Sequence, residues 1–529
     1  MTTAVQSPRW HRPASAHLRT AAGIAGALVA WELAAVRLDG SFLLAGPVDV
    51  LAHIAIHAGL MWRALTVTLW AATLGFVFGN LAAIMLAAVA ILVPRLERPI
   101  QALALLVFCL PLVATGPILR VLYGPGIGPQ VTLAALACYY TTFVPLLVGL
   151  RAAPATWFDL VTSYGRGSWA RLVHVRAFAC MPYLIAGLQI AAPAAFLGAM
   201  IGEFTGAERG MGVLAIRAMR GLDVDATWAL ATIAAAVSIA AYAAIGWAGR
   251  RLWPDRPAMI LATSPMTGGR RPRSAAVAAL ATAAVVLVGW QVAMDAAGLN
   301  PFFAKRPGDV WDFLVTHAAA AEHRAQLFAA LGQTLGYTLP GYLAGLGLGA
   351  WLACVFVTWP GVAGTALPLA VALRSIPIVT TAPLIVLALG RGPAGTITIV
   401  AVMIFFPTLV ACIQGLRQAP GQVLDVFDSY ATGRWRTLLL ARVPAMLPAL
   451  FAAARMAVPA AILAVTVAEW LATGTGIGNL MALTASTSNY NMLWSAIVIL
   501  TLVSFAAHVV VGALERAVLR VYAPEQVAR

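Results

Sequence analysis

Two glutamates, Glu203 and Glu469, stand 266 residues apart, each at the end of a long apolar stretch and before a glycine-rich turn. A charged group within a segment apolar enough to cross a bilayer costs about 2.5–3.5 kcal/mol, so each glutamate calls for a reason. A carboxylate in this position can organise a gate where two halves of a protein meet, or it can cap the helix that follows. Arg374 is a third candidate for a functional charge, because it lies in a predicted span and the corresponding residue in the other half, Phe108, carries no charge. If it faces a cavity, its guanidinium suits an anionic solute; otherwise it snorkels or pairs with a neighbouring carbonyl.

The offset of 266 residues recurs at many further positions, from Thr68 to Trp228 in the first half, and identifies a tandem duplication. The matched positions include Thr68 and Thr334, Gly75 and Gly341, Pro111 and Pro377, Arg151 and Arg417, Asp159 and Asp425, Ser163 and Ser429, Gly167 and Gly433, Trp169 and Trp435, and Trp228 and Trp494. Trp31 also has a partner at a slightly different offset, Trp290. The duplicated polar positions are therefore the ones to examine for function.

The composition is that of an integral membrane protein. The 529 residues are 61% hydrophobic and 10% charged, with a mean hydropathy of +0.88. A helix needs roughly 20 apolar residues to cross a hydrocarbon core of about 30 Å. Such spans are predicted near 17–37, 62–92, 99–123, 129–150, 180–202 and 225–249, and near 274–297, 328–358, 364–389, 394–416, 446–469 and 490–514. We therefore expect an all-α fold of twelve transmembrane helices, in two six-helix repeats that run parallel because each has an even number of spans.

The net charge of +15 is distributed as a topology signal rather than as a nucleic-acid-binding surface. Arginines gather before the first predicted span and after the second, fourth and sixth, while acidic residues collect in the alternate loops. The positive-inside rule then places both termini in the cytoplasm. The predicted domains are a first repeat at 1–250, a cytoplasmic linker at 251–273 rich in Pro, Gly, Ser and Arg, and a second repeat at 274–529.

Between the fourth and fifth predicted spans of each copy lies a polar segment, at about 155–178 and 420–444. Each segment is predicted to form a short helix, a break at 165–168 or 431–433, and a second amphipathic helix that presents Trp and Leu on one face. It is too short and too charged to cross the membrane. The pattern favours docking into a groove on a partner protein. The alternative is a helix that lies on anionic lipid.

These segments resemble the signature loop of the membrane subunits of bacterial ABC importers of the type I, binding-protein-dependent class. In that loop a Glu-Ala-Ala sequence is followed by Gly and then by Ile-x-Leu-Pro. Asp159 and Asp425 stand in place of the Glu, Gly165 and Ala431 in place of the Gly, and Pro182 and Pro448 close the motif. Two further segments, Leu373-Arg374-Ser375-Ile376-Pro377 and Gly476-Ile477-Gly478-Asn479-Leu480, look like the nitrate/sulfonate/taurine branch of the class.

The resemblance implies a coupling helix in each copy that sits in a groove of a separate ATPase subunit. The residues expected to dock are Asp159, Ser163, Gly165, Gly167, Trp169 and Arg171 in the first copy, and Asp425, Ser429, Ala431, Gly433, Arg434 and Trp435 in the second. It also implies two ATPase subunits that carry ATP and Mg, an extracytoplasmic solute-binding protein, and a place in the bacterial inner membrane.

The sequence carries no motif for chemistry of its own. Lys305 is the single lysine and does not belong to a G-x-x-x-x-G-K-[ST] loop, and the eight histidines are scattered without metal-ligand or triad spacing. Five cysteines predict neither a disulfide framework nor a zinc site. We therefore expect a non-enzymatic permease that binds no cofactor or metal and moves a small anionic or polar solute. The alternatives are a twelve-helix secondary transporter of the major-facilitator type and a membrane scaffold without transport.

Overall fold

The computed structural model describes residues 14–38, 44–124, 126–153, 155–253, 272–359, 382, 385–386 and 388–522. Within these residues every regular element is a helix. The first repeat contains α1 (Ala14–Arg37), α2 (Pro47–Ile56), α3 (Ala58–Leu92), α4 (Glu97–Phe108), α5 (Leu112–Tyr123), α6 (Gly128–Arg151), α7 (Ala155–Ser163), α8 (Ser168–Arg171), η1 (Leu172–Arg176), α9 (Ala177–Phe204), α10 (Met211–Arg220) and α11 (Val224–Leu252).

The described part of the second repeat follows the same order, without counterparts of α4 and α5, whose positions lie mostly outside the described residues. It contains α12 (Pro272–Ala296), α13 (Pro307–Trp311), η2 (Asp312–Thr316), α14 (Ala320–Thr358), α17 (Pro393–Arg417), α18 (Gly421–Ser429), α19 (Arg434–Thr437), η3 (Leu438–Arg442), α20 (Val443–Ala468), η4 (Glu469–Thr473), α21 (Gly476–Ser486) and α22 (Tyr490–Tyr522). The elements labelled η are π-helical turns that continue a neighbouring α-helix.

Eight helical segments of the described chain are long and apolar enough to cross a membrane, and all eight coincide with predicted spans. They are Ala58–Leu92, Gly128–Arg151, Ser168–Phe204, Val224–Leu252, Ala320–Thr358, Pro393–Arg417, Arg434–Thr473 and Tyr490–Tyr522. The predicted spans 17–37 and 274–297 are helical as α1 and α12. Most of the predicted span 364–389, together with Arg374 and residues 254–271 of the predicted linker, lies outside the described residues.

The predicted single span at 99–123 is instead two helices. α4 and α5 are bent by 91° relative to each other. The break falls at Cys109, Leu110 and Pro111, and Pro111 is the N-cap of α5. Proline has no N–H to continue the helix, and it disfavours the α conformation of the residue before it. The apolar composition predicted a segment that lies in the membrane, but it did not predict the bend.

Glycines allow α3 to lie directly on α6, and the second repeat builds the same contact between α14 and α17. A Cβ atom at Gly75 would lie 2.3 Å from Ala134 Cβ, and one at Gly341 would lie 2.7 Å from Val400 Cβ. Gly79 and Gly345 follow four residues later on the same faces and are equally crowded. Small residues at this spacing let helix backbones approach closely where lipid supplies no hydrophobic driving force.

The two repeats pack against each other through the bent pair of the first. α4 contacts α12 and α22, and α5 contacts α20, α21 and α22. Val113 on α5 and Ile201 on α9 belong to the same buried apolar cluster as Ala461 and Val465 on α20. The interface between the repeats is thus part of one continuous core.

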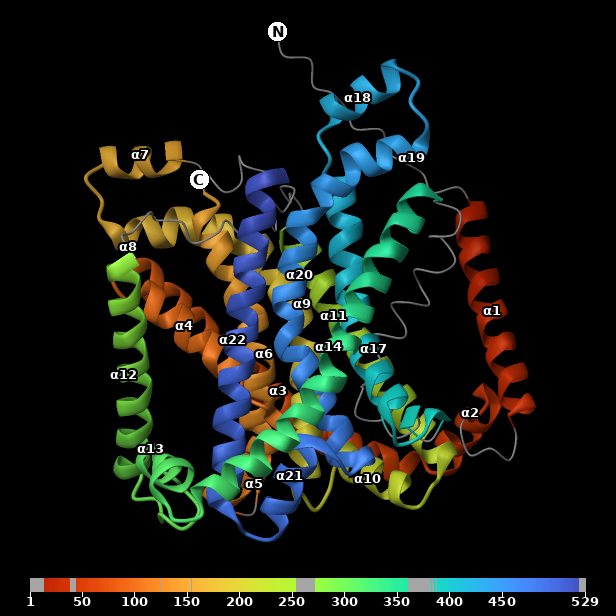
Figure 1. Ribbon diagram of the computed structural model, residues 1–529. Helices are drawn as coiled ribbons and strands as arrows, with labels where there is room; N and C mark the ends of the chain where they lie inside the picture. The colour runs from red at the N-terminus through yellow and green to blue at the C-terminus, as the bar shows by residue number, and fades with distance from the viewer. Residues whose placement is uncertain are drawn as a thin grey trace.

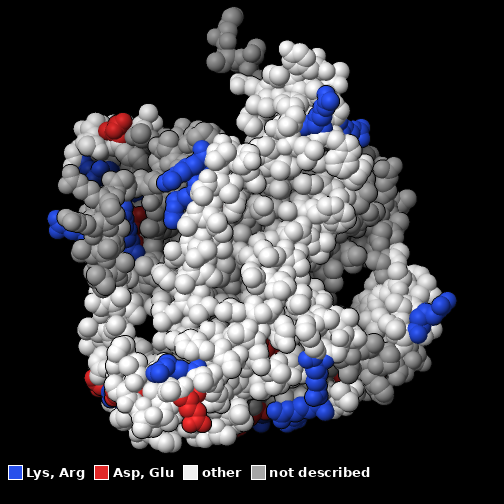
Figure 2. Space-filling model, viewed as in Figure 1, with Lys and Arg blue, Asp and Glu red and all other residues white. Residues whose placement is uncertain are grey.

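The elements with repeated polar motifs gather at opposite ends of the bundle. Figure 1 shows α7, α8, α18 and α19 at one end, which we call the loop end, and α10 and α21 at the other, which we call the cap end. In the face shown in Figure 2 the middle of the bundle is largely uncharged, and charged side chains lie toward the two ends. This is the distribution expected of a bundle whose middle lies in hydrocarbon.

Candidate functional site

Glu203 links three helices of the first repeat at the cap end. The residue is 2% exposed. Thr68 Oγ1 on α3 donates to Glu203 Oε1 at 2.6 Å, and the backbone N–H of Gly212 donates to Glu203 Oε2 at 2.6 Å. The N–H of Met211 donates in turn to Thr68 Oγ1 at 2.8 Å. The carboxylate and the hydroxyl therefore satisfy N–H groups at the start of α10, where the helix itself supplies no acceptor.

Glu469 makes the same contacts in the second repeat. It is fully buried, and Thr334 Oγ1 on α14 donates to its Oε1 at 2.8 Å. The N–H of Gly478 donates to Glu469 Oε2 at 2.8 Å, and the N–H of Ile477 donates to Thr334 Oγ1 at 2.8 Å. Each of these residues lies 266 positions after its counterpart in the first repeat. The contacts are those of a side-chain cap on α10 and α21, one of the two roles considered for these glutamates.

The glycine-rich turns after the glutamates are required by this geometry. Gly210 and Gly476 have φ angles of 138° and 81°, a backbone conformation that favours glycine. A Cβ atom would lie 2.2 Å from Glu203 Cδ at Gly210, and 2.0 Å from Glu469 Oε1 at Gly476. The turns are therefore places where backbone lies against a buried carboxylate.

The two polar segments at the loop end fold alike. α7 and α18 each end in a serine whose hydroxyl donates to the carbonyl three residues earlier, Ser163 to Leu160 at 2.7 Å and Ser429 to Val426 at 2.8 Å. A left-handed residue then reverses the chain, Gly165 with φ 68° and Ala431 with φ 48°. The predicted order of helix, break and helix is therefore present in both repeats. The residues expected to dock lie together in each loop.

The second helix of each loop differs from its prediction. It is the first turn of a long helix, Ser168–Phe204 or Arg434–Thr473, that continues into the bundle. Trp169 is 68% exposed whereas Leu172 is 8% exposed, and Trp435 is 57% exposed whereas Leu438 is 3% exposed. The prediction that Trp and Leu share one face is wrong, because the leucine side packs into the core of the repeat.

Ala431 occupies a position whose conformation favours glycine. A left-handed conformation costs a residue with a Cβ about 1–2 kcal/mol, and part of this is offset because glycine has a more flexible unfolded chain. We expect Ala431→Gly to raise the free energy of unfolding by about 0.5–1 kcal/mol. Denaturant unfolding of the purified chain in mixed micelles measures this. The reciprocal change in the first repeat, Gly165→Ala, is expected to lower it, and equal stability of all three proteins would contradict the argument.

Sequence reasoning missed an ion pair inside the second repeat. Arg455 Nε on α20 lies 2.9 Å from Glu515 Oε2 on α22, and His508 Nδ1 lies 3.0 Å from the Arg455 carbonyl oxygen. The first-repeat positions that correspond to Arg455 and Glu515 are Gln189 and Gly249. Both members of the pair thus differ together between the copies. That joint difference was the available signal, because a charge inside a bilayer needs a partner.

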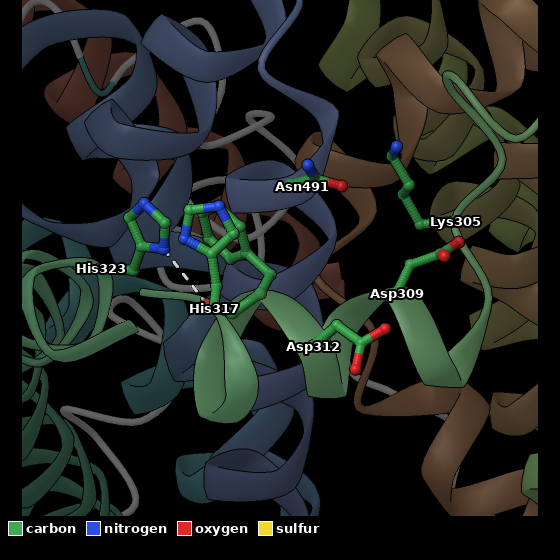
Figure 3. A pocket seen from close by; sticks show the side chains of 7 residues that line it. Lys305, Asp309, Asp312, His317, His323 and Asn491 are labelled. Carbon is green, nitrogen blue, oxygen red and sulfur yellow. Dashed lines mark hydrogen bonds between the residues drawn. The ribbon is translucent and has the colours of Figure 1, made fainter. Parts of the chain in front are cut away.

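A polar cavity of about 400 Å³ lies near the cap end of the second repeat. Figure 3 shows the side chains around it, among them Lys305, Asp309, Asp312, His317 and His323. The rings of His317 and His323 have centroids 5.3 Å apart, so two histidines that are scattered in sequence meet here. In the part of the chain that the structure describes, no group of three or more His, Cys, Asp or Glu side chains is placed to hold a metal.

Comparison with known proteins finds one family model that matches both halves of the chain. The family model described as "Binding-protein-dependent transport system inner membrane component" matches residues 51–254 and 334–520. A "Probable ABC transporter permease protein" of Haemophilus influenzae is 30% identical over 42% of this chain and 90% of its own length. The riboflavin transport system permease protein RibX of Chloroflexus aurantiacus is 28% identical over 45% of this chain and 88% of its own length.

A third relative is the formylaminopyrimidine transport permease protein ThiX of Halalkalibacterium halodurans. It is 27% identical over 41% of this chain and 88% of its own length. Each relative thus matches nearly in full while covering less than half of this chain. Because the family model matches two separate segments that together make up more than half of the sequence, this chain belongs to the binding-protein-dependent transport system inner membrane components and carries two such permease domains fused in tandem.

Proposed function

We propose that this chain forms the membrane pathway of an ATP-driven importer, with twelve transmembrane helices and both termini in the cytoplasm. Two separate ATPase subunits dock on the loop end, one on α7–α8 and one on α18–α19, and they carry the ATP and Mg. An extracytoplasmic binding protein delivers solute at the cap end. Family membership supports this proposal over the major-facilitator alternative.

The observation that carries the proposal is the pair of matching loops at one end of the bundle. Both present exposed apolar and acidic side chains that no described helix covers: Trp157, Leu160 and Asp159 in the first repeat, and Val426, Tyr430 and Asp425 in the second. An amphipathic helix that leaves such a face open is the form in which helices enter grooves on a partner. Two loops of the same structure can each bind one copy of the same partner protein.

The second helix of each loop gives docking a mechanical consequence. α8 and α19 belong to the unbroken helices Ser168–Phe204 and Arg434–Thr473, and Glu203 and Glu469 lie near the far ends of these helices. Each loop is therefore connected to the cap end through one continuous helix. This arrangement supports a role for Glu203 and Glu469 at an outer gate, in addition to their contacts with α10 and α21. The neighbouring residues Ile201 and Ala468 share one apolar cluster at the repeat interface.

The solute is proposed to be small and polar or anionic. Two of the relatives are named for riboflavin and formylaminopyrimidine transport. Arg374, as a lone cation in an apolar segment, supports an anionic group on the solute, and it lies outside the described residues. The mixed charge of the Lys305 cavity supports contact with a polar partner at the cap end.

The decisive experiment is co-purification of the chain with its ATPase. Asp159→Arg combined with Asp425→Arg reverses the charge of both exposed docking carboxylates. We expect wild type to retain stoichiometric ATPase and the double variant to lose it, because a like charge against an established contact costs several kcal/mol. The matched control is Asp159→Glu combined with Asp425→Glu, which keeps the charge and is expected to retain the ATPase. If the folded wild-type chain retains no ATPase, the importer proposal is wrong.

A further inference from the structure

A cavity of about 320 Å³ lies at the loop end of the second repeat, between the end of α14 and the α18–α19 segment. The residues that line it include two arginines, three threonines and one aspartate: Arg434, Arg442, Thr358, Thr432, Thr437 and Asp428. Two cations and one anion give it a net positive charge. We call it the arginine cavity.

The two arginines of this cavity are available to a ligand. The structure shows no hydrogen bond or ion pair from either guanidinium to another described side chain or backbone group. The threonine hydroxyls are already engaged, since Thr432 Oγ1 donates to the Phe427 carbonyl at 2.8 Å and Thr358 Oγ1 donates to the Cys354 carbonyl at 2.7 Å. The guanidinium groups therefore provide the main recognition, and their planar donors suit the oxygens of a phosphate.

The corresponding arginine of the first repeat is used within the fold. Arg176 donates to the Leu150 carbonyl at 3.1 Å and lies 4.9 Å over the ring of Phe158. The residue that corresponds to Phe158 in the second repeat is Leu424, which has no ring to hold Arg442. Arg442 therefore lacks the ring contact that Arg176 makes.

The surroundings of the cavity are amphiphilic. Trp359 follows Thr358 directly and makes an edge contact with Trp435, with ring centroids 5.6 Å apart. Tryptophans of this kind mark the boundary between headgroups and acyl chains. Leu439 and Leu440 are 60% and 65% exposed on η3, the helical turn that also carries Arg442. A phosphate on the arginines and hydrocarbon along these leucines would match both parts of the surface.

We propose that the arginine cavity binds the phosphate of an anionic phospholipid. A basic pocket beside membrane helices is the expected place for such a headgroup. The apolar residues beside it distinguish a lipid from free phosphate, which needs only the arginines. The bound lipid ties the α18–α19 loop of the second repeat to the bilayer, whereas the first-repeat loop is held by contacts within the chain. Because Arg434 is also one of the residues expected to dock, the test uses the chain without its ATPase.

The test measures lipid retained by the full chain, purified without partners from nanodiscs that contain phosphatidylcholine and phosphatidylglycerol. Native mass spectrometry reports bound phosphatidylglycerol for wild type and for Arg434→Gln combined with Arg442→Gln. Each arginine near an anionic headgroup contributes about a fivefold affinity, so we expect the double variant to bind about 25-fold more weakly. Arg436→Gln is the control, because Arg436 lies on the same short helix but does not line the cavity, and it should bind as wild type.

A second variant tests whether weaker lipid binding by the double variant results from misfolding. Asp428→Asn removes the carboxylate that opposes an anion, so we expect phosphatidylglycerol to bind about fivefold more tightly, a gain that a damaged protein does not produce. Two results would overturn the proposal. They are equal phosphatidylglycerol binding by wild type and the double variant, and displacement of the lipid by inorganic phosphate alone.

Discussion

Replacing Glu469 with alanine is expected to lower the free energy of unfolding of the purified chain by about 2–4 kcal/mol. The change removes the acceptor of two buried donors, the hydroxyl of Thr334 and the N–H of Gly478. A buried donor left without a partner costs about 1–3 kcal/mol. Denaturant unfolding in mixed micelles gives the free energy, and the equivalent Glu203→Ala should show a loss of the same size.

Two variants make the result of Glu469→Ala interpretable. Glu469→Gln keeps an amide oxygen that can still accept one of the two hydrogen bonds, so its loss should be close to half as large. Glu208→Ala removes an exposed carboxylate four residues after the buried end of α9 and should change stability by less than about 0.5 kcal/mol. If Glu469→Ala unfolds like wild type yet abolishes solute uptake, the carboxylate serves the pathway and its capping contacts are not needed for stability.

Removing the guanidinium of Arg455 is expected to lower the free energy of unfolding by still more. Arg455→Ala leaves Glu515, whose side chain is 8% exposed, without the cation that lies 2.9 Å from it. Breaking a buried ion pair by deleting one partner costs about 3–5 kcal/mol, because the remaining charge is uncompensated. The same mixed-micelle unfolding experiment measures the loss. It should appear as a shift of the unfolding midpoint of the whole chain, since α20 and α22 are tied together at this point.

The matched test of the ion pair is to remove both charges. Arg455→Met combined with Glu515→Leu should recover most of the stability, since an apolar pair of similar volume needs no partner in lipid. Gln189→Ala, at the corresponding first-repeat position, removes a single hydrogen bond to the Tyr242 carbonyl and should cost only about 1 kcal/mol. If the double variant is as unstable as Arg455→Ala, the two side chains do not act as a pair.

The sequence by itself determined the class, the duplication and most of the helices. Eight predicted spans are helices because an apolar run of this length has no other structure available in lipid. The constant offset identified the residues that recur, and family membership confirmed the resemblance carried by the loops around Asp159 and Asp425. The sequence also singled out Glu203 and Glu469, because a carboxylate in an apolar stretch needs a partner, and their role at a gate stays a prediction.

Only the tertiary structure decided what those partners are. Thr68 lies 135 residues before Glu203 and Thr334 lies 135 residues before Glu469, and no local pattern links a hydroxyl to a carboxylate over such a distance. The pairing of Arg455 with Glu515, the bend at Pro111 and the burial of Leu172 beside an exposed Trp169 likewise depend on which helices become neighbours. Apolar length is a property of one segment and can be read along the chain. Hydrogen-bond partners and buried faces are properties of two segments in contact, and they exist only once the helices have packed.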